Sequence, residues 1–420
     1  MPSKSLILSA VTLIVISGFA TTVPAYAASK EQVLHSFRDF PDGALPYAGL
    51  MSDPAGNLYG TTSDGGYEFN CGYGPGCGTV FELTLGSNGR WTEKVLYRFC
   101  GNRSCLDGSV PFAGLTRDAA GNLYGTTAAG GAFCTGGCGT VFQLTPHTGG
   151  IWTERVLHSF SGKDGSSPVG GLTLDAAGNL YGTTYFGGTV FELSPTADGK
   201  WTEKVLHRFN GADGSAPSNV PIFDAAGNLY GTTSLGGTHN YGVVFMLKPR
   251  TNGTWTEKVL HNFNGKDGIS PSTLIFDAAG NLYGTTYAGG HATSCGGVCG
   301  TVFELTPKAG GVWTEKVLHS FNNNRKDGIQ PWAGLIFDPA GNLYGTTAQG
   351  GRSACSCGTV FKLIPAANGK WTEKMLHNFE GKDGGSPLSG SLIFDAAGNL
   401  YGTTYGGGTQ GFGNVFKVAP

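Results

Sequence analysis

Charged residues are scarce in this sequence, and the two signs nearly cancel. Asp, Glu, Lys and Arg make up 13% of the 420 residues, and the formal net charge is −2. Such a chain offers no broad basic surface to nucleic acid or to an anionic membrane. We therefore expect no nucleic-acid partner and no electrostatic attachment to a membrane.

Helical patterns and long apolar segments are missing from most of the chain. Beyond the N-terminal region, no stretch of eleven or more residues repeats its apolar positions with a period of 3.6, so we expect almost no helix. The one long apolar run, residues 6–19, follows Lys4 and precedes Ala-Tyr-Ala at residues 25–27. This pattern is typical of a secretory signal peptide at residues 1–27. We expect the remaining single domain, residues 28–420, to be secreted or periplasmic, without membrane insertion.

Common catalytic motifs are also lacking. The sequence contains no G-x-S-x-G elbow, no H-E-x-x-H zinc motif and no phosphate-binding loop. We assign no catalytic residue on this basis, and we expect a binding protein more than an enzyme.

Glycine, in contrast, is abundant, with 72 residues, and it belongs to a repeated phrase. Gly-Asn-Leu-Tyr-Gly-Thr-Thr occurs seven times, beginning at Gly56, Gly121, Gly178, Gly227, Gly280, Gly341 and Gly398. Self-similarity of this kind indicates one supersecondary unit that is copied along the chain.

Each repeat contains four short segments with strand character. In the third copy these are residues 171–175, 179–184, 188–193 and 201–209, which are rich in β-branched and aromatic residues and are separated by Gly, Pro, Asn and Asp. We name the connections by the strands they join: the 2–3 loop lies within a repeat, and the 4–1 loop leads to the next repeat. In an antiparallel four-stranded unit these two loops emerge on the same face.

The two ends of the domain predict that the repeats close into a ring. Residues 31–37 match a fourth strand with no repeat before it, and residues 414–418 match a third strand with no fourth after it. Together they complete one unit and remove the exposed edges of an open array. We therefore predict an all-β fold, a seven-bladed β-propeller whose last blade includes the N-terminal strand. An open solenoid is the alternative.

The ten cysteines form five local pairs. The pairs are Cys71 with Cys77, Cys100 with Cys105, Cys134 with Cys138, Cys295 with Cys299, and Cys355 with Cys357. An even count in an exported chain favours disulfides that pin the loops of one face, over a zinc site whose ligand spacing would have to be regular. The ring closed by Cys355 and Cys357 is tight, so this pair is either oxidised and strained or readily reduced.

The 4–1 loops carry the candidate ligand-binding residues. Every loop contains an Asp-Gly with Pro four residues after the Asp, at Asp42, Asp107, Asp164, Asp213, Asp267, Asp327 and Asp383. We expect these carboxylates to ring the entrance of the central channel. They serve either as turn residues or as ligands for calcium and polar hydroxyl groups.

Aromatic residues follow that Pro in three copies, at Tyr47, Phe112 and Trp332. We expect them to offer a stacking surface for sugar rings beside the carboxylates, or else to pack the channel mouth. The candidate ligand-binding set is therefore Asp42, Tyr47, Asp107, Phe112, Asp327, Trp332 and Asp383.

Other repeated polar residues are interpreted as structural. His occupies one position of the fourth strand in six copies, with Tyr97 in the seventh, and a Trp and a Glu recur earlier in that strand. An acid or base is not needed in every blade, so packing and hydrogen bonding explain them better. A second set of aspartates, Asp53 and its equivalents, belongs to the turn between the first two strands.

The phrase Asp-Ala-Ala-Gly-Asn-Leu-Tyr-Gly-Thr-Thr, followed by Gly-Gly and Gly-Thr-Val-Phe-Glu-Leu, resembles the GloVer repeat of bacterial extracellular proteins, also called choice-of-anchor proteins. The resemblance covers residues 31–420 and implies an exported β-repeat protein, without catalytic residues to transfer. We expect a monomer that binds an extracellular glycan or a protein ligand. The alternatives are a polysaccharide-acting glycosidase or lyase that uses the channel-mouth carboxylates, and a protein-interaction scaffold.

Overall fold

The computed structural model describes residues 30–70, 76–101, 104–134, 136–292 and 294–420. The expected signal peptide at residues 1–27 and the cysteine at position 71 lie outside these ranges. Within the described ranges, no helix is both long and apolar enough to span a membrane.

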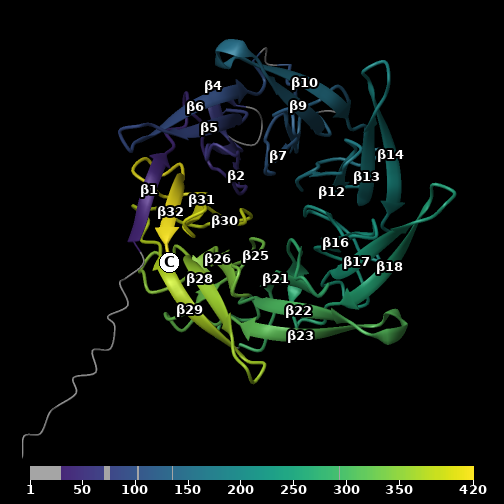
Figure 1. Cartoon of the computed structure of the whole chain (residues 1–420), viewed down its shortest axis with the longest axis vertical. Coiled ribbons are helices and arrows are strands. Elements are labelled where there is room, and N and C mark those ends of the chain that lie inside the picture. Colours follow the sequence, from purple (N-terminus) through teal and green to yellow (C-terminus); the bar gives the residue numbers. More distant parts are fainter. Residues whose placement is uncertain (1–29, 71–75, 102–103, 135, 293) are drawn as a thin grey trace, which may run out of the picture.

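Seven small antiparallel sheets surround a central axis, as Figure 1 shows. In each sheet the strands follow one another from the axis to the rim. The chain is thus a seven-bladed β-propeller, as the sequence predicts.

The first four blades are built as follows. Blade 1 contains β2 (Met51–Ser52), β3 (Leu58–Thr62), β5 (Thr79–Leu85) and β6 (Trp91–Arg98). Blade 2 contains β7 (Thr116–Arg117), β8 (Leu123–Thr127), β9 (Thr140–Pro146) and β10 (Trp152–Ser159). Blade 3 contains β11 (Thr173–Leu174), β12 (Leu180–Thr184), β13 (Thr189–Pro195) and β14 (Trp201–Arg208). Blade 4 contains β15 (Ile222–Phe223), β16 (Leu229–Thr233), β17 (Val243–Pro249) and β18 (Trp255–Asn262).

The last three blades follow the same order. Blade 5 contains β20 (Ile275–Phe276), β21 (Leu282–Ala288), β22 (Thr301–Pro307) and β23 (Trp313–Ser320). Blade 6 contains β25 (Ile336–Phe337), β26 (Leu343–Thr347), β28 (Thr359–Pro365) and β29 (Trp371–Asn378). Blade 7 contains β30 (Ile393–Phe394), β31 (Leu400–Thr404), β32 (Asn414–Ala419) and the N-terminal β1 (Lys30–Ser36).

The remaining elements are short and lie in the connections. They are β4 (Gly65–Asn70), β19 (Ile269–Pro271), β24 (Gly328–Ile329), β27 (Gln349–Gly350) and two three-residue 3-10 turns, η1 (Thr148–Gly150) and η2 (Ala309–Gly311). The expectation of almost no helix is therefore confirmed for the described residues.

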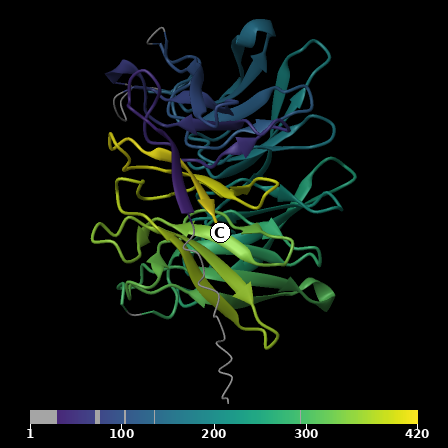
Figure 2. The same cartoon turned by 60° about the vertical axis from the view of Figure 1, so that its left-hand side comes forward.

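The ring closes through both ends of the domain. β1 pairs antiparallel with β32, from Lys30 opposite Ala419 to Ser36 opposite Asn414. Figures 1 and 2 show these two strands side by side. Across the same closure, Thr403 Oγ1 of blade 7 donates a 2.7 Å hydrogen bond to the carbonyl of Ala48, which leads into blade 1.

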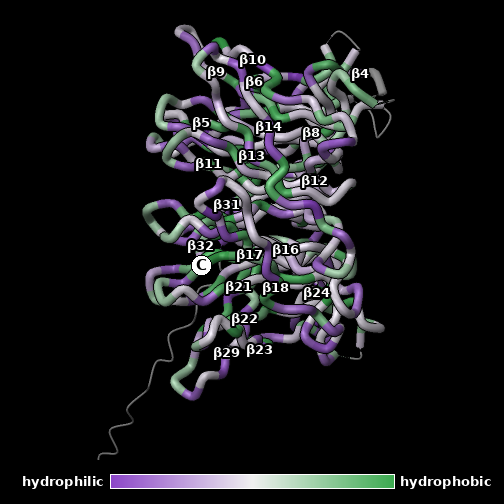
Figure 3. The backbone as a smooth tube through the Cα atoms, turned by 90° about the vertical axis from the view of Figure 1, so that its right-hand side faces the viewer, coloured by the Kyte–Doolittle hydropathy of each residue, from purple (hydrophilic) through white to green (hydrophobic). Residues whose placement is uncertain are grey.

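The core lies between the blades. A Phe that follows each fourth strand packs edge-to-face on a Phe of the next blade, as Phe99 does on Phe142 with ring centroids 5.1 Å apart. A Cβ on Gly60, the second Gly of the repeated phrase, would collide with the ring of Phe81, which explains why a residue without a side chain stands there. Figure 3 shows hydrophobic stretches along the strands and hydrophilic stretches at many of the outer turns.

Two details of the strands depart from a regular four-stranded unit. The first strand of each blade pairs with the second over only two residues, because the chain before it turns toward the neighbouring blade. There it accepts hydrogen bonds from side chains, as the Ala113 carbonyl does from Thr61. In the fourth strand, a register shift at Leu96 lets this residue join the same buried cluster as Phe99, although simple alternation would place Leu96 on the opposite side.

Candidate functional site

A cavity of about 500 Å³ opens on the propeller axis. Its lining comes from 4–1 loops, which supply Tyr47, Phe112 and Trp332, from a 2–3 loop, which supplies Tyr185 and Phe186, and from the end of β21, which supplies Tyr287. Two loop families therefore meet at one site.

The three aromatic residues predicted from the sequence lie together in this cavity. The rings of Tyr47 and Phe112 are 5.0 Å apart between centroids, and those of Tyr47 and Trp332 are 6.3 Å apart. Each residue follows a Pro that fixes the approach of the chain to the first strand. Trp332 also packs on Tyr287 at 4.6 Å with tilted planes, so the contacts form a continuous aromatic wall.

Three further aromatic residues of the wall were missed by sequence reasoning. Tyr185, Tyr287 and Tyr405 all stand directly after a Gly-Asn-Leu-Tyr-Gly-Thr-Thr phrase, where the other four blades carry Ser or Ala. Tyr405 contacts Tyr47 at 6.0 Å. Comparison of the position directly after the repeated phrase would have revealed these three tyrosines. Blades 3, 5 and 7 lack an aromatic residue after the Pro and carry one at this position instead.

Blade 4 breaks this pattern and gives the cavity a polar side. It carries Ser218 and Ser234 at the two positions, and their hydroxyl groups are hydrogen-bonded at 2.9 Å. Asn219 lines the same side and is held by Thr232 Oγ1 and the Pro271 carbonyl, to which its amide nitrogen donates. The cavity thus has an aromatic wall facing hydroxyl and amide groups.

The described residues that line this cavity include no Asp, Glu, Lys, Arg or His. Burial raises the pKa of the Tyr47 hydroxyl, a hydrogen bond with Ser389 opposes that shift, and the charge interaction with Tyr405 adds to it. Tyr47 is therefore neutral at neutral pH and can donate a hydrogen bond. The lining suits an uncharged ligand.

The seven aspartates of the 4–1 loops are placed differently from the expectation. None lines the cavity, so the expected carboxylate ring at the channel entrance is not formed there. Instead Asp42, Asp327 and Asp383 accept hydrogen bonds from the fourth-strand His35, His319 and His377, at 3.1, 3.0 and 2.9 Å. Asp107 is bound to Tyr97 and to the Cys100 amide, both at 2.9 Å. The Asp stands near the outer end of the loop, whereas residues flanking the Pro line the cavity.

A family comparison explains why the blades are so similar. A model of the Gloeobacter/Verrucomicrobia repeat matches residues 19–198, 185–316 and 292–420. The chain belongs to the Gloeobacter/Verrucomicrobia repeat family. This confirms the resemblance seen in the repeated phrase.

Solved structures similar to this Gloeobacter/Verrucomicrobia repeat protein include virginiamycin B lyase from Staphylococcus aureus. That match covers 93% of this chain and 99% of the lyase, with 15% identity and a TM-score of 0.56. A protein from Lactobacillus plantarum matches over 77% of this chain and 84% of its own, with 16% identity and a TM-score of 0.53. At these identities the likeness concerns the fold alone. A search of the curated proteins finds no match.

The boundaries between the blades of this repeat protein hold recurrent acidic clusters. At each boundary a Glu from one fourth strand faces the Asp of the preceding 4–1 loop; we call the His or Tyr, the Asp and the Glu a seam cluster. In three of them, including His35, Asp42 and Glu93, possible ligand atoms lie within 4.8 Å of one another. Two carboxylates and one imidazole suit a calcium ion poorly, because calcium takes six to eight oxygen ligands.

The glutamates of the seam clusters have strongly raised pKa values. Burial raises the pKa of Glu93 to about 7; the charge of His35 opposes this rise, and the charge of Asp42 adds a smaller contribution to it. Burial and Asp107 raise the pKa of Glu154 to about 8. One oxygen in each of the seven glutamates is buried without a hydrogen-bond partner in the described chain. Sequence reasoning treated these residues as blade packing and missed this arrangement.

Four predicted disulfides are present. Cys100 is bonded to Cys105, Cys134 to Cys138, Cys295 to Cys299, and Cys355 to Cys357. Cys77 is also disulfide-bonded, and its sulfur lies beside those of Cys100 and Cys105. This contact brings a 2–3 loop and a 4–1 loop together, in agreement with the predicted common face.

Proposed function

We propose that this repeat propeller is an extracytoplasmic binding protein whose axial cavity accepts an uncharged glycan. The observation that carries the proposal is the composition of the lining, with an aromatic wall on one side and Ser and Asn side chains on the other. A sugar ring presents an apolar face of C–H groups and an edge of hydroxyl groups. Such a ligand would match both sides of the cavity.

The wall leaves an aromatic surface available for stacking. Trp332 is 36% exposed although its ring packs on Tyr287 and Tyr47, so it is both positioned and accessible. Phe186 is 61% exposed on the opposite lining loop. Large rings held by their neighbours lose little conformational entropy when a ligand binds.

The proposed location outside the cytoplasm has two supports. The N-terminal sequence has the pattern of a secretory signal peptide. In addition, the described chain has no free cysteine, and disulfides persist in oxidising compartments.

A glycan array probed with the oxidised chain, residues 28–420, tests the proposal. We expect neutral oligosaccharides to bind in preference to uronic-acid or sulfated ones, because the described lining offers no cation to balance an anionic sugar. Intrinsic fluorescence should change on binding, since Trp332 lies at the cavity while the other six Trp open fourth strands.

The Trp332→Ala variant should weaken binding by about tenfold or more, which corresponds to the loss of roughly 1.4 kcal/mol of stacking. The matched control is Phe133→Ala, which removes a 52% exposed ring from a 2–3 loop outside the cavity. Equal binding by the two variants would reject the cavity as the site. The absence of any glycan binding would instead favour a protein-interaction scaffold.

The cavity favours binding over hydrolysis. Hydrolysis of polysaccharides generally requires two carboxyl groups beside the scissile bond. The Asp residues first considered for that role are engaged in seam clusters, and the described lining carries only Tyr as a titratable residue.

A further inference from the structure

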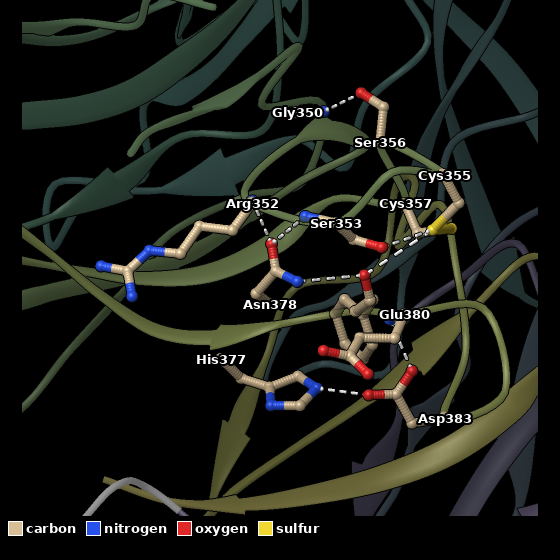
Figure 4. The surroundings of a disulfide bond; sticks show 11 residues. Gly350, Arg352, Ser353, Cys355, Ser356, Cys357, His377, Asn378, Glu380 and Asp383 are labelled. Atoms are coloured by element: carbon tan, nitrogen blue, oxygen red, sulfur yellow. Dashed lines mark hydrogen bonds and ion pairs between the residues drawn. A yellow bond between two sulfur atoms is a disulfide. The ribbon is translucent and has the colours of Figure 1, made fainter. Parts of the chain in front are cut away.

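The Cys355–Cys357 disulfide lies in the 2–3 loop of blade 6, between β27 and β28. Figure 4 shows it beside Ser353, with the His377–Asp383 pair below. Blades 2 and 5 carry disulfides in their own 2–3 loops, Cys134–Cys138 and Cys295–Cys299, which provide internal references.

The blade 6 disulfide is more accessible than its two references. Its first cysteine, Cys355, is exposed and its second, Cys357, is only half-buried. In the references the second cysteine is buried, with Cys138 6% exposed and Cys299 fully covered. An attacking thiolate approaches one sulfur in line with the S–S bond. Blade 6 therefore offers two accessible cysteines to attack, where each reference offers only its first.

The backbone of this loop also differs. A single residue, Ser356, separates the two cysteines, and it has a φ of 53°, in the left-handed region that L-residues avoid. The blade 5 reference loop turns with Gly296 and Gly297, which adopt positive φ without that cost. The blade 2 reference loop turns with Gly136 and Gly137, although Cys134 itself has a φ of 65°. Ser356 is held there by a 2.8 Å hydrogen bond from the Gly350 amide to its hydroxyl. Opening the disulfide lets Ser356 leave the strained conformation.

Neighbouring groups can accommodate the thiol products. Ser353 Oγ lies 3.1 Å from Cys355 Sγ and can donate a hydrogen bond to a thiolate. Cys357 packs against the apolar cluster that contains Phe379 at the boundary of blades 6 and 7.

We propose that Cys355–Cys357 is a thiol–disulfide exchange site for low-molecular-weight thiols, whereas the two reference disulfides are structural. An incoming thiolate attacks Cys355 Sγ, an S–S bond forms to it, and the bond to Cys357 breaks with release of the Cys357 thiolate. A second thiolate attacks the sulfur of the bound thiol and forms an S–S bond with it. The bond to Cys355 Sγ breaks, the oxidised thiol dimer leaves, and the Cys355 thiolate is released. Two thiols are oxidised, and one protein disulfide is reduced to two thiols.

The test is equilibration of the full oxidised domain in glutathione buffers, acid quenching, alkylation and mass mapping of each cysteine pair. We expect Cys355–Cys357 to be half-reduced at a ratio of squared reduced to oxidised glutathione about tenfold or more below that of both references. Reduction of all three pairs together, or of the references first, would overturn the proposal.

A loop graft tests whether the tight loop is the cause of the early reduction of Cys355–Cys357. Replacement of Cys355-Ser356-Cys357 by the five-residue sequence at positions 134–138 gives blade 6 the ring size of blade 2. The grafted disulfide should then be reduced at the same ratio as Cys134–Cys138. If the graft leaves the early reduction unchanged, the tight loop is not its origin. The double variant Cys355→Ser/Cys357→Ser should abolish the early-reducing pair and leave the midpoints of the references in place.

Discussion

Tyr97 Oη donates a 2.9 Å hydrogen bond to Asp107 Oδ2 at the boundary of blades 1 and 2, where the other six boundaries pair a His with the Asp. The sequence separation of this pair is ten residues, whereas the His–Asp pairs are separated by six to eight. The longer side chain therefore accompanies the longer loop, which also holds the Cys100–Cys105 disulfide.

The Tyr97→Phe variant removes this hydrogen bond while the ring keeps its packing on Phe99. We expect the free energy of unfolding to fall by about 1 kcal/mol, because Asp107 retains the Cys100 amide as a partner. Chemical denaturation measures the change. Tyr241→Phe, at an exposed side chain, is the control and should leave stability unaltered.

The seam clusters predict a fold that is more stable in mildly acidic than in alkaline solution. The folded state raises the pKa of Glu31, Glu93, Glu203, Glu257, Glu315 and Glu373 to about 7, and that of Glu154 to about 8. A raised pKa means that the folded chain holds protons which the unfolded chain has lost above pH 4.5. This stabilisation is therefore lost as the pH rises through 7.

Two histidines oppose this trend. Burial lowers the pKa of His207 and His377 despite their Asp partners, so their contribution is present above pH 6.5 and is lost as the pH falls from there through their lowered folded-state pKa. Seven glutamates outweigh two histidines, and urea unfolding at pH 5.5 and 8 should show higher stability at pH 5.5. Glu203→Gln should reduce that difference, and a double variant with Glu257→Gln should reduce it further. An unchanged pH dependence in the double variant would contradict the assignment.

The turn between the first and second strands of each blade depends on its Asp. Asp224 accepts hydrogen bonds from the amides of Ala226 and Asn228, from the Asn228 side chain and from the Tyr230 hydroxyl. We expect Asp224→Ala to cost about 2 kcal/mol, since several donors lose their acceptor together. Asp198→Ala, in an exposed turn between the third and fourth strands, should cost far less. Thermal unfolding of the two variants provides the comparison.

Removal of residues 28–36 should open the ring. Without β1, the outer edge of β32 has unpaired backbone groups, and exposed edges promote association. We expect a lower melting temperature and concentration-dependent oligomers in light scattering. A peptide of residues 28–37 added in trans should restore the monomer. A truncated chain that stays monomeric and equally stable would show that blade 7 does not need the N-terminal strand.

The sequence predicted the axial site only in part. Tyr47, Phe112 and Trp332 could be identified because Asp-Gly, with Pro four residues after the Asp, recurs in all seven repeats. The residue after that Pro can therefore be compared between the repeats. Tyr287 stands at a position whose residue varies between the repeats, which the sequence alone reveals, but only the fold shows that Tyr287 and Ser218 line one cavity. The Asp residues lie in the predicted loops, but they belong to the seam clusters and do not line the cavity.

The sequence by itself determined the number of blades, the short strands, the turn aspartates and the local cysteine pairs, because these features depend on residues close together in one repeat. Only the tertiary structure decided which loop residues reach the axis and which remain in the seams. A 4–1 loop crosses from the rim to the axis, and its path is fixed by contacts with two neighbouring blades. Asp42 therefore stays with His35, while Tyr47, five residues later, joins the cavity.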